Sequence, residues 1–423
     1  MSQDPRSEAP LAYEQTLPLA GFRVLDYSQF VAGPLATMLL ADLGADVVKI
    51  ESPVGDAYRH YEPLGQGESR RFYALNRNKR SVVCDLKTEA GRALSQRLIT
   101  TADAVVHNMP PERAVSFGLD PDSIRAVNRR AVVAVVSAFG SAGPQAGKVG
   151  YDLIAQAFSG LLMADARVGD AVPRRSGGIP FSDITAGFLA CISVAAGLAG
   201  RATTDRPYFE VSLLGAALAT QVQTFVRTEA DLADDDDERV IPADLKRIGA
   251  EVAGWEELEP YYRCYQAADG YFALCCLTTT QRRRALDVLG LQDQWVGDPQ
   301  ARPGSAAERD QRAALPRQFE RVLLERPVEY WIAAFTRAGV PAGEVRLVDQ
   351  MFNDGQVRSN GLVRRIQQRQ GGPVDVLGAL FKIDGVARQS PVPAPQLGEH
   401  TDEILDELAK SDEMSNALRA PCG

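Results

Sequence analysis

An aspartate beside an apolar run is the residue of this chain best placed to do chemistry. Asp183 lies in the segment 180–187 (PFSDITAG), at the start of the apolar run 184–198, and the segment 150–156 (GYDLIAQ) precedes it by about thirty residues. Aspartate and serine commonly cap the first free N–H groups of a helix, and from these residues alone capping is the favoured interpretation. The helix dipole at the same place keeps a carboxylate ionised, so Asp183 is also a candidate nucleophile.

Four basic residues are candidates for phosphate binding, because lysine and arginine hold phosphates through charge-assisted hydrogen bonds. They are Lys79, Arg80, Lys87 and Lys148. An isolated basic residue is more often a solvated surface charge, so both interpretations stay open for each.

The composition narrows the classes of function. The six cysteines contain no CxxC pair, and the three histidines, His60, His107 and His400, offer no metal-ligand spacing. We therefore expect no metal, structural roles for the histidines, and reduced thiols in a cytoplasmic protein. The formal charge of −9 argues against a nucleic-acid partner. The N-terminus lacks an apolar signal core and the run 186–200 falls short of the ~20 residues that span a bilayer, so no membrane role is expected.

The elements that must position these residues follow an alternating pattern. Residues 22–27 and 46–51 are typical of buried strands, and Gly33-Pro34 opens a helix over 33–43 between them, which predicts a βαβ unit and a parallel sheet. Further apolar runs extend the pattern to a doubly wound domain. They are strands at 81–84, 103–106 and 131–137 and a helix at 89–101.

A second domain is expected after an acidic run. The 423 residues exceed one typical domain, and the run 231–238 breaks the alternation because like charges repel and stay solvated. Beyond it, Asp269-Gly270 predicts a turn between strands at 261–266 and 271–277. Helices are expected at 281–289 and 311–324.

The order and spacing of several short motifs resemble the class III CoA-transferases, the family of formyl-CoA and carnitine CoA-transferases, over nearly the whole chain. The motifs are RVLDYSQFVAGP (23–34), LGADVVKIE (43–51), SPVGD (52–56) with Arg59, NKRS (78–81) running into DLK (85–87), the two segments around Asp183, and GEHTD (398–402). The resemblance implies an interlocked homodimer of α/β subunits, with the active site between the large domain of one and the small domain of the other.

The domain boundaries expected from this resemblance are as follows. A Rossmann-like large domain that binds CoA comprises residues 1–215 and 340–423. A smaller α+β domain, residues 225–335, shapes the acceptor pocket, and 216–224 and 336–339 are linkers.

The resemblance also implies a covalent mechanism with CoA as co-substrate. Asp183 attacks an acyl-CoA to give a mixed anhydride, CoA thiolate converts the anhydride to an aspartyl-CoA thioester, and an acceptor carboxylate reverses the sequence. Each tetrahedral intermediate needs N–H donors facing its oxyanion. Backbone N–H groups near Val31, Ala32 and Gly33 are candidates, because small residues permit close approach, although plain turn chemistry explains them equally well.

The residues implied to contact CoA come from several loops. Asn108 and Met109 are expected to contact the adenine, and the segment from Val149 through Tyr151 to Asp152 is expected to contact the pantetheine. The other positions carried over from the family, or offered for the phosphates, are Val31, Ala32, Arg80, Lys87, Arg113 and Lys148.

Some positions depart from the family pattern. Ser52 stands where the formyl-transferring branch has an arginine, and Ser116-Phe117-Gly118 replaces an arginine-containing tripeptide. Arg113 lies about one helical turn before Ser116 and supplies the missing charge if this segment is helical. The glycine-rich run of the formyl-CoA transferases is absent, so oxalate and formate are not the expected substrates. Lys246, Arg247 and Arg263 are candidates for holding a second carboxylate of a dicarboxylic acid.

Three other functions stay open. An α-methylacyl-CoA racemase would need a histidine base where Tyr151 stands, and a tyrosine of ordinary pKa near 10 is a poor proton acceptor at neutral pH. A catalytically silent acyl-CoA-binding protein has no need of the acidic Asp183. A thioesterase would require water to outcompete the acceptor acid.

Overall fold

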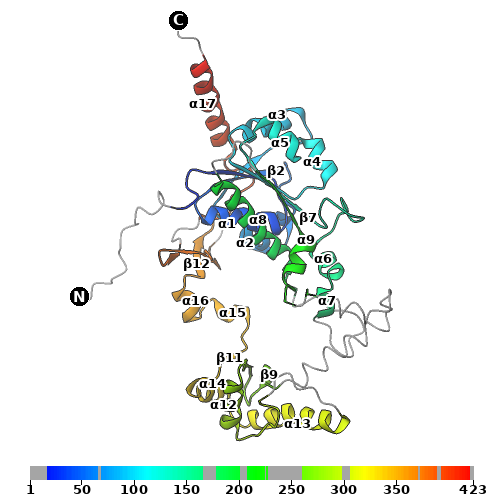
Figure 1. The fold of residues 1–423 in the computed structure, drawn as a ribbon. Helices are drawn as coiled ribbons and strands as arrows, with labels where there is room; N and C mark the ends of the chain where they lie inside the picture. Colours follow the sequence, from blue (N-terminus) through cyan, green and yellow to red (C-terminus); the bar gives the residue numbers. More distant parts are fainter. Residues whose placement is uncertain are drawn as a thin grey trace, which may run out of the picture. The chain divides into compact units, whose positions relative to one another are not determined.

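The chain divides into two compact units (Figure 1). The computed structural model describes residues 17–64, 68–164, 178–200, 207–223, 225–226, 260–297, 305–369, 372–387 and 392–419. Unit 1 draws on residues 1–161, 175–227 and 352–423, and unit 2 on residues 162–174 and 228–351. The acidic run 231–238, Lys246 and Arg247 lie outside the described residues.

Unit 1 is built on a six-stranded parallel sheet with the order β5-β2-β1-β6-β7-β8. Counted along the chain, these six strands lie in the order 3-2-1-4-5-6 of doubly wound Rossmann-type sheets. The predicted α/β fold with a parallel sheet is therefore confirmed. The strands are β1 Arg23–Asp26, β2 Asp46–Glu51, β5 Lys79–Val83, β6 Ala104–His107, β7 Val132–Ser137 and β8 Tyr208–Ser212.

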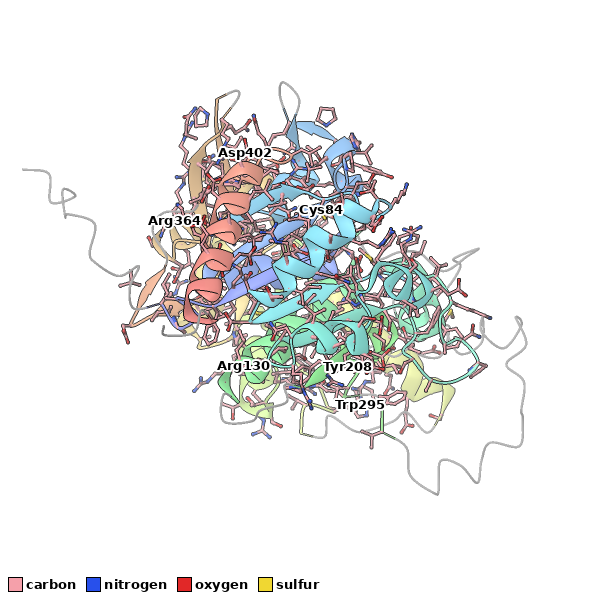
Figure 2. The ribbon with its side chains drawn as sticks, turned by 90° about the horizontal axis from the view of Figure 1, so that it is seen from above. Cys84, Arg130, Tyr208, Trp295, Arg364 and Asp402 are labelled. Carbon is pink, nitrogen blue, oxygen red and sulfur yellow. The ribbon has the colours of Figure 1, made fainter. Side chains whose placement is uncertain are left out.

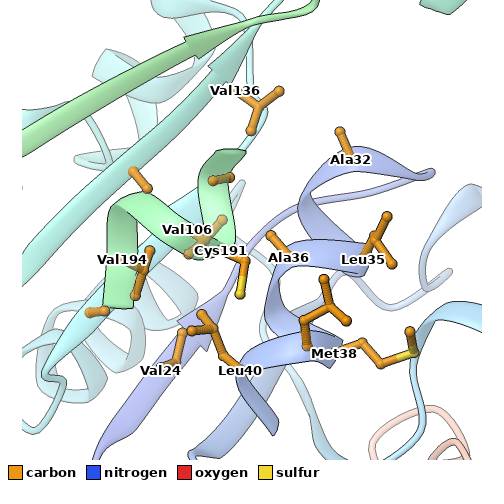
Figure 3. Packing of buried hydrophobic residues seen from close by; sticks show 14 of the residues in the cluster. Val24, Ala32, Leu35, Ala36, Met38, Leu40, Val106, Val136, Cys191 and Val194 are labelled. Atoms are coloured by element: carbon orange, nitrogen blue, oxygen red, sulfur yellow. The ribbon is translucent and has the colours of Figure 1, made fainter. Parts of the chain in front are cut away.

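Helices cover both faces of this sheet because its strands are apolar on both sides. Val24 and Val106 pack toward α1 and α8, which lie side by side in Figure 3, whereas Leu25 and Val105 pack toward α3, α5 and α17. The helices of the first face are α1 Ala32–Asp42, α6 Asp152–Phe158, α8 Phe181–Ala199 and α9 Leu213–Ala219. Those of the second are α3 Glu89–Thr100, α4 Pro111–Phe117, α5 Pro121–Val127 and α17 Thr401–Arg419.

Helix α8 approaches its neighbours closely because glycines lie on its packed side. A Cβ on Gly187 would stand 2.9 Å from the carbonyl oxygen of Ala32, and one on Gly197 would stand 2.7 Å from the side chain of Val132. Among the described residues, α8 is the one helix whose length and hydropathy would fit a membrane span, and it packs on α1, α9 and β7.

The C-terminal motif of unit 1 attaches to the edge strand β5. The His400 N–H donates to the Ser81 carbonyl at 3.0 Å, and the Val83 N–H donates to Thr401 Oγ1 at 3.2 Å. These bonds satisfy the backbone of an edge strand, which is otherwise open to pairing with another chain. The smaller elements of unit 1 are η2 Ala57–His60, β3 Pro63–Leu64, β4 Glu68–Ser69, α2 Arg70–Leu75, α16 Gly355–Ser359, β12 Val363–Gln367, β13 Pro373–Leu377, β14 Lys382–Ile383 and β15 Val386–Ala387. The helix α7 Leu161–Ala164 begins at the boundary between the units.

Unit 2 combines a three-stranded antiparallel sheet, in the order β11-β10-β9, with helices around an aromatic core. Capping boxes at Thr278 and Ser305 start two of its helices earlier than predicted. The helix α14, which begins after Pro327, was not predicted. The elements are β9 Tyr262–Gln266, β10 Tyr271–Cys275, α12 Thr279–Leu289, α13 Ala306–Leu323, α14 Val328–Arg337, β11 Ala342–Glu344 and α15 Val348–Met351.

Candidate active site

A cavity of about 710 Å³ lies within unit 1 at the carboxyl ends of its parallel strands. Its walls come from the segments that follow β1, β2, β5, β6 and β7, together with residues 147–151 and Asp183. Cys84, after β5, and Tyr208, at the start of β8, are two of the lining residues labelled in Figure 2. The volume falls in the range of pockets for cofactor-sized ligands.

The cavity includes the point where the strand order reverses, between β1 and β6. Asn108 joins the two loops there. Its Oδ1 accepts from the Gln29 N–H at 3.0 Å, and its Nδ2 donates to the Gln29 carbonyl at 2.7 Å. Ligands of open α/β sheets bind at such switch points. Asn108 therefore shapes the cavity as well as lining it.

A buried ion network supports the loop between β1 and α1. Lys49 Nζ lies 3.0 Å from Asp56 and 3.7 Å from Asp26, and it donates to the Ser28 carbonyl at 2.8 Å. Lys79 Nζ lies 2.9 Å from Asp26. Burial alone would raise the pKa of Asp26, but the charges of Lys49 and Lys79 bring it well below its ordinary range. Both charges of each pair are satisfied, as deep burial requires.

The supported loop has an unusual backbone. Phe30 has φ of +69°, a left-handed conformation that non-glycine residues seldom adopt. The Phe30 N–H donates to Asp56 at 3.4 Å, so the buried network is bonded to the residue that carries this strain. Asp26, Lys49 and Asp56 belong to three of the family motifs, but the sequence assigned no role to any of them because they lie on different elements. Charged residues within apolar strand runs were the available signal.

Asp183 is brought to the cavity by the packing of α8 on α1. It lies in the first turn of α8, four residues before Gly187, whose missing side chain lets α8 meet the start of α1. Residues four apart share one face of a helix. Asp183, Val31 and Ala32 consequently line the same cavity. The first N–H groups of α1 have no acceptor within their own helix and are available to a ligand.

The electrostatics of Asp183 differ from the expectation. Burial, and then the negative charge of Asp152, raise the pKa of Asp183 from 3.8 to about 7. The helix N-terminus was predicted to keep this carboxylate ionised, whereas desolvation and the charge of Asp152 favour its protonated form at this half-buried position.

Asp152 is buried and ties two helices together. Its Oδ1 accepts from the Ser182 N–H at 2.9 Å, and its Oδ2 accepts from Gln156 Nε2 at 2.7 Å. It therefore caps α8 from the start of α6, one residue before Asp183. Asp152 does not line the cavity, where the pantetheine contact was expected.

Most of the residues predicted to contact CoA do line the cavity. They are Val31, Ala32, Lys87, Asn108, Met109, Arg113, Lys148, Val149 and Tyr151. Lys79 and Arg80 are elsewhere. Lys79 is buried against Asp26, and the Arg80 guanidinium pairs with Asp46, Glu403 and Glu407 at 2.6 to 3.0 Å. Their charges are thus engaged by protein acids, outside the cavity wall.

The segment around Arg113 is helical, as its suggested role requires. Arg113 and Ser116 both lie in α4, where Ser116 Oγ donates to the Arg113 carbonyl at 2.8 Å. Arg113 lines the cavity and Ser116 does not, while Ser52 lines it without contributing a charge. Across the described ranges, no group of three histidine, cysteine or acidic side chains could hold a metal ion.

The chain resembles known CoA-transferases over almost its full length. The sequence profile named CoA-transferase family III matches residues 19–401. A succinate–glutarate CoA-transferase of Agrobacterium fabrum is 29% identical, covering 92% of this chain and 96% of that protein. An acetyl-CoA:oxalate CoA-transferase of Acetobacter aceti is 30% identical, covering 93% of this chain and 96% of that protein. A CAIB/BAIF family protein from Brucella suis has a crystal structure that matches with a TM-score of 0.73 at 28% identity, covering 92% of this chain and 99% of that one. This chain belongs to CoA-transferase family III.

Proposed function

We propose that the protein moves CoA from an acyl-CoA to a carboxylic acid through covalent intermediates on Asp183. The position of this carboxylate carries the proposal, because Asp183 lies at the wall of the 710 Å³ cavity beside the first residues of α1. Membership of the CoA-transferase family supplies the reaction class.

The proposed reaction consists of four acyl transfers. An Asp183 oxygen attacks the thioester carbonyl and the C–S bond breaks. The CoA thiolate departs, and an acyl-aspartyl anhydride forms. The thiolate then attacks the aspartyl carbonyl and releases the donor acid, leaving CoA bound to Asp183 as a thioester. The acceptor carboxylate attacks the aspartyl carbonyl of this thioester, the C–S bond breaks, and an anhydride between the acceptor and Asp183 forms. The released thiolate attacks the acceptor acyl carbon of this anhydride, and the bond from that carbon to the Asp183 oxygen breaks. No net proton is consumed, and Asp183 ends as a carboxylate.

Two features of unit 1 support these steps. The N–H groups at Ala32 and Gly33 begin α1 and are suited to an oxyanion, because the helix N-terminus carries partial positive charge. Asp152 holds the Ser182 N–H and so fixes the turn that presents Asp183. Lys87, Arg113 and Lys148 are proposed for the CoA phosphates, with Asn108 and Met109 at the adenine and residues 149–151 along the pantetheine.

The acceptor is proposed to be a short carboxylic acid. Relatives are named for succinate with glutarate and for oxalate, which are all dicarboxylic. Oxalate therefore stays among the compounds to test, although the missing glycine-rich run disfavours it. We also propose the homodimer that the family resemblance implies.

The racemase alternative is disfavoured by the histidine at the cavity. Of the three histidines, His107 lines it, and burial lowers the pKa of His107 to about 4. A group this weakly basic is poorly matched to proton abstraction at neutral pH.

Intact-protein mass spectrometry tests the proposed function. Wild type and Asp183→Ala are incubated with a panel of acyl-CoAs and then treated with hydroxylamine. We expect an acyl or CoA adduct on wild type alone, converted to a hydroxamate at Asp183. Deuterium exchange at the acyl α-carbon without any adduct would instead indicate racemase chemistry.

A further inference from the structure

An arginine lies in a cluster of aromatic residues next to the cavity. The guanidinium carbon of Arg71 stands 5.6 Å from the centre of the Tyr58 ring and 5.8 Å from that of Tyr61. Phe30 packs edge-on against Tyr58 and also against Tyr151, each at 5.5 Å between ring centres. Phe30 and Tyr151 line the cavity together with Asp183. The cluster therefore borders the cavity through these two rings.

Tyr58 connects Arg71 electrostatically to Asp183. Burial raises the pKa of Tyr58, the neighbouring Arg71 opposes this rise, and the charge of Asp183 adds to it. The Tyr58 hydroxyl thus lies within electrostatic reach of both side chains. Arg71 is not among the groups that shift the pKa of Asp183, which is raised by burial and by Asp152. Tyr58 and Phe30 connect the guanidinium to the cavity wall that Asp183 also lines.

This arrangement suits a substrate with two carboxyl groups. A flat guanidinium beside aromatic rings offers a fork of N–H donors that matches a carboxylate. An acyl group whose thioester carbonyl meets Asp183 and whose far end is ionised needs such a cation a short distance away. Building on the function proposed above, we propose that Arg71 binds the second carboxylate of a short dicarboxylic acyl group.

Arg71 has two partners, the carboxylate of Glu62 and the hydroxyl of Tyr58, to which it is also hydrogen-bonded. Glu62 Oε1 accepts from Arg71 Nε at 2.9 Å and from an Arg71 terminal nitrogen at 2.5 Å. The side chains of the pair are 45% and 50% exposed, so the bond is in contact with water and is weakly held. A substrate carboxylate shares or replaces Glu62 at the guanidinium. Removing the charge of Glu62 should consequently strengthen substrate binding.

Binding to a catalytically inert protein tests the proposal directly. Full-length Asp183→Ala is titrated by calorimetry with glutaryl-CoA and with valeryl-CoA, which has the same chain length but ends in a methyl group. Adding Arg71→Met should lower the affinity for glutaryl-CoA at least about fivefold, which is the loss expected for a half-exposed charged hydrogen bond. The affinity for valeryl-CoA should change by less than about twofold. Adding Glu62→Gln should raise the affinity for glutaryl-CoA and leave that for valeryl-CoA unchanged.

Arg70→Met is the matched control, because Arg70 is exposed and adjacent on α2. It should leave both ligands unchanged. If Arg71→Met changes the affinities for the two ligands equally, or changes neither, the assignment of Arg71 is overturned. A hydroxamate at Asp183 in wild type would in that case still support CoA transfer. If no acyl adduct forms and neither acyl-CoA binds, the proposed function itself fails.

Discussion

The raised pKa of Asp183 predicts that the nucleophile destabilises the protein in a pH-dependent way. Burial and the charge of Asp152 shift this pKa from 3.8 to about 7, so folding disfavours the ionised form. The cost is absent below about pH 4, grows as pH rises from 4 to 7, and is constant above. Replacing Asp183 with asparagine, which has nearly the same shape and no charge, should therefore stabilise the folded chain at neutral and alkaline pH.

The magnitude follows from the size of the shift. Three pH units at about 1.4 kcal/mol each give a penalty of about 4 kcal/mol for wild type at pH 8. At pH 5.5, where the carboxyl group is mostly protonated in the folded chain, the penalty is about 2 kcal/mol. The free energy of unfolding of Asp183→Asn should exceed that of wild type by these amounts. The gap should widen by about 2 kcal/mol between the two pH values.

Amide hydrogen exchange is the suitable assay because it is local. The three tryptophans, at 255, 295 and 331, fall within the range of unit 2, whereas α8 belongs to unit 1, so the assay needs a probe within unit 1. Exchange of peptides from β7 and α8 gives the opening free energy of unit 1. Asp122→Asn, at an exposed position in the first turn of α5, is the control and should show no such gap. A constant difference between Asp183→Asn and wild type across this pH range would refute the reasoning.

Two further substitutions test the surroundings of the site. Asp152→Asn keeps an oxygen for the Ser182 N–H but removes the charge that helps raise the pKa of Asp183, so the pH midpoint of adduct formation should move lower. An unchanged midpoint would show that Asp152 acts only through its hydrogen bonds. Lys49→Met leaves buried Asp56 without its counter-ion and should destabilise unit 1 by about 3 to 5 kcal/mol in the same exchange assay, whereas a change below about 1 kcal/mol would contradict the network.

The central strands and α1 were predictable from the sequence because they are buried on both sides. Residues 46–51 form β2 with the bounds expected, and the helix expected over 33–43 spans Ala32–Asp42. Runs of apolar residues between glycine-containing turns leave little choice of structure. The start of α8 at Phe181 was less predictable, because its cap is the Asp152 side chain from another helix.

The buried charges were not predictable in the same way. Lys49 belongs to the segment 46–51, and its chemical type suggests a strand end in water. Its partners Asp26 and Asp56 are joined to it only when β1, β2 and the segment before η2 come together. Arg80 was assigned to phosphate for a similar reason, since its pairing with Glu407 depends on α17, more than three hundred residues away. Sequence identifies such residues as charged but does not reveal what neutralises them.

The raised pKa of Asp183 has a chemical consequence for the proposed reaction. Ordinary carboxylic acids titrate near pH 4 to 5, so a carboxylate with a pKa near 7 is more basic than the donor and acceptor acids with which it exchanges CoA. Greater basicity makes Asp183 the better nucleophile toward a thioester, while a sizeable fraction stays ionised at neutral pH. A helix cap that merely satisfied backbone N–H groups would gain nothing from burial beside Asp152. The cost in stability is thus the expected counterpart of a nucleophile tuned to neutral pH.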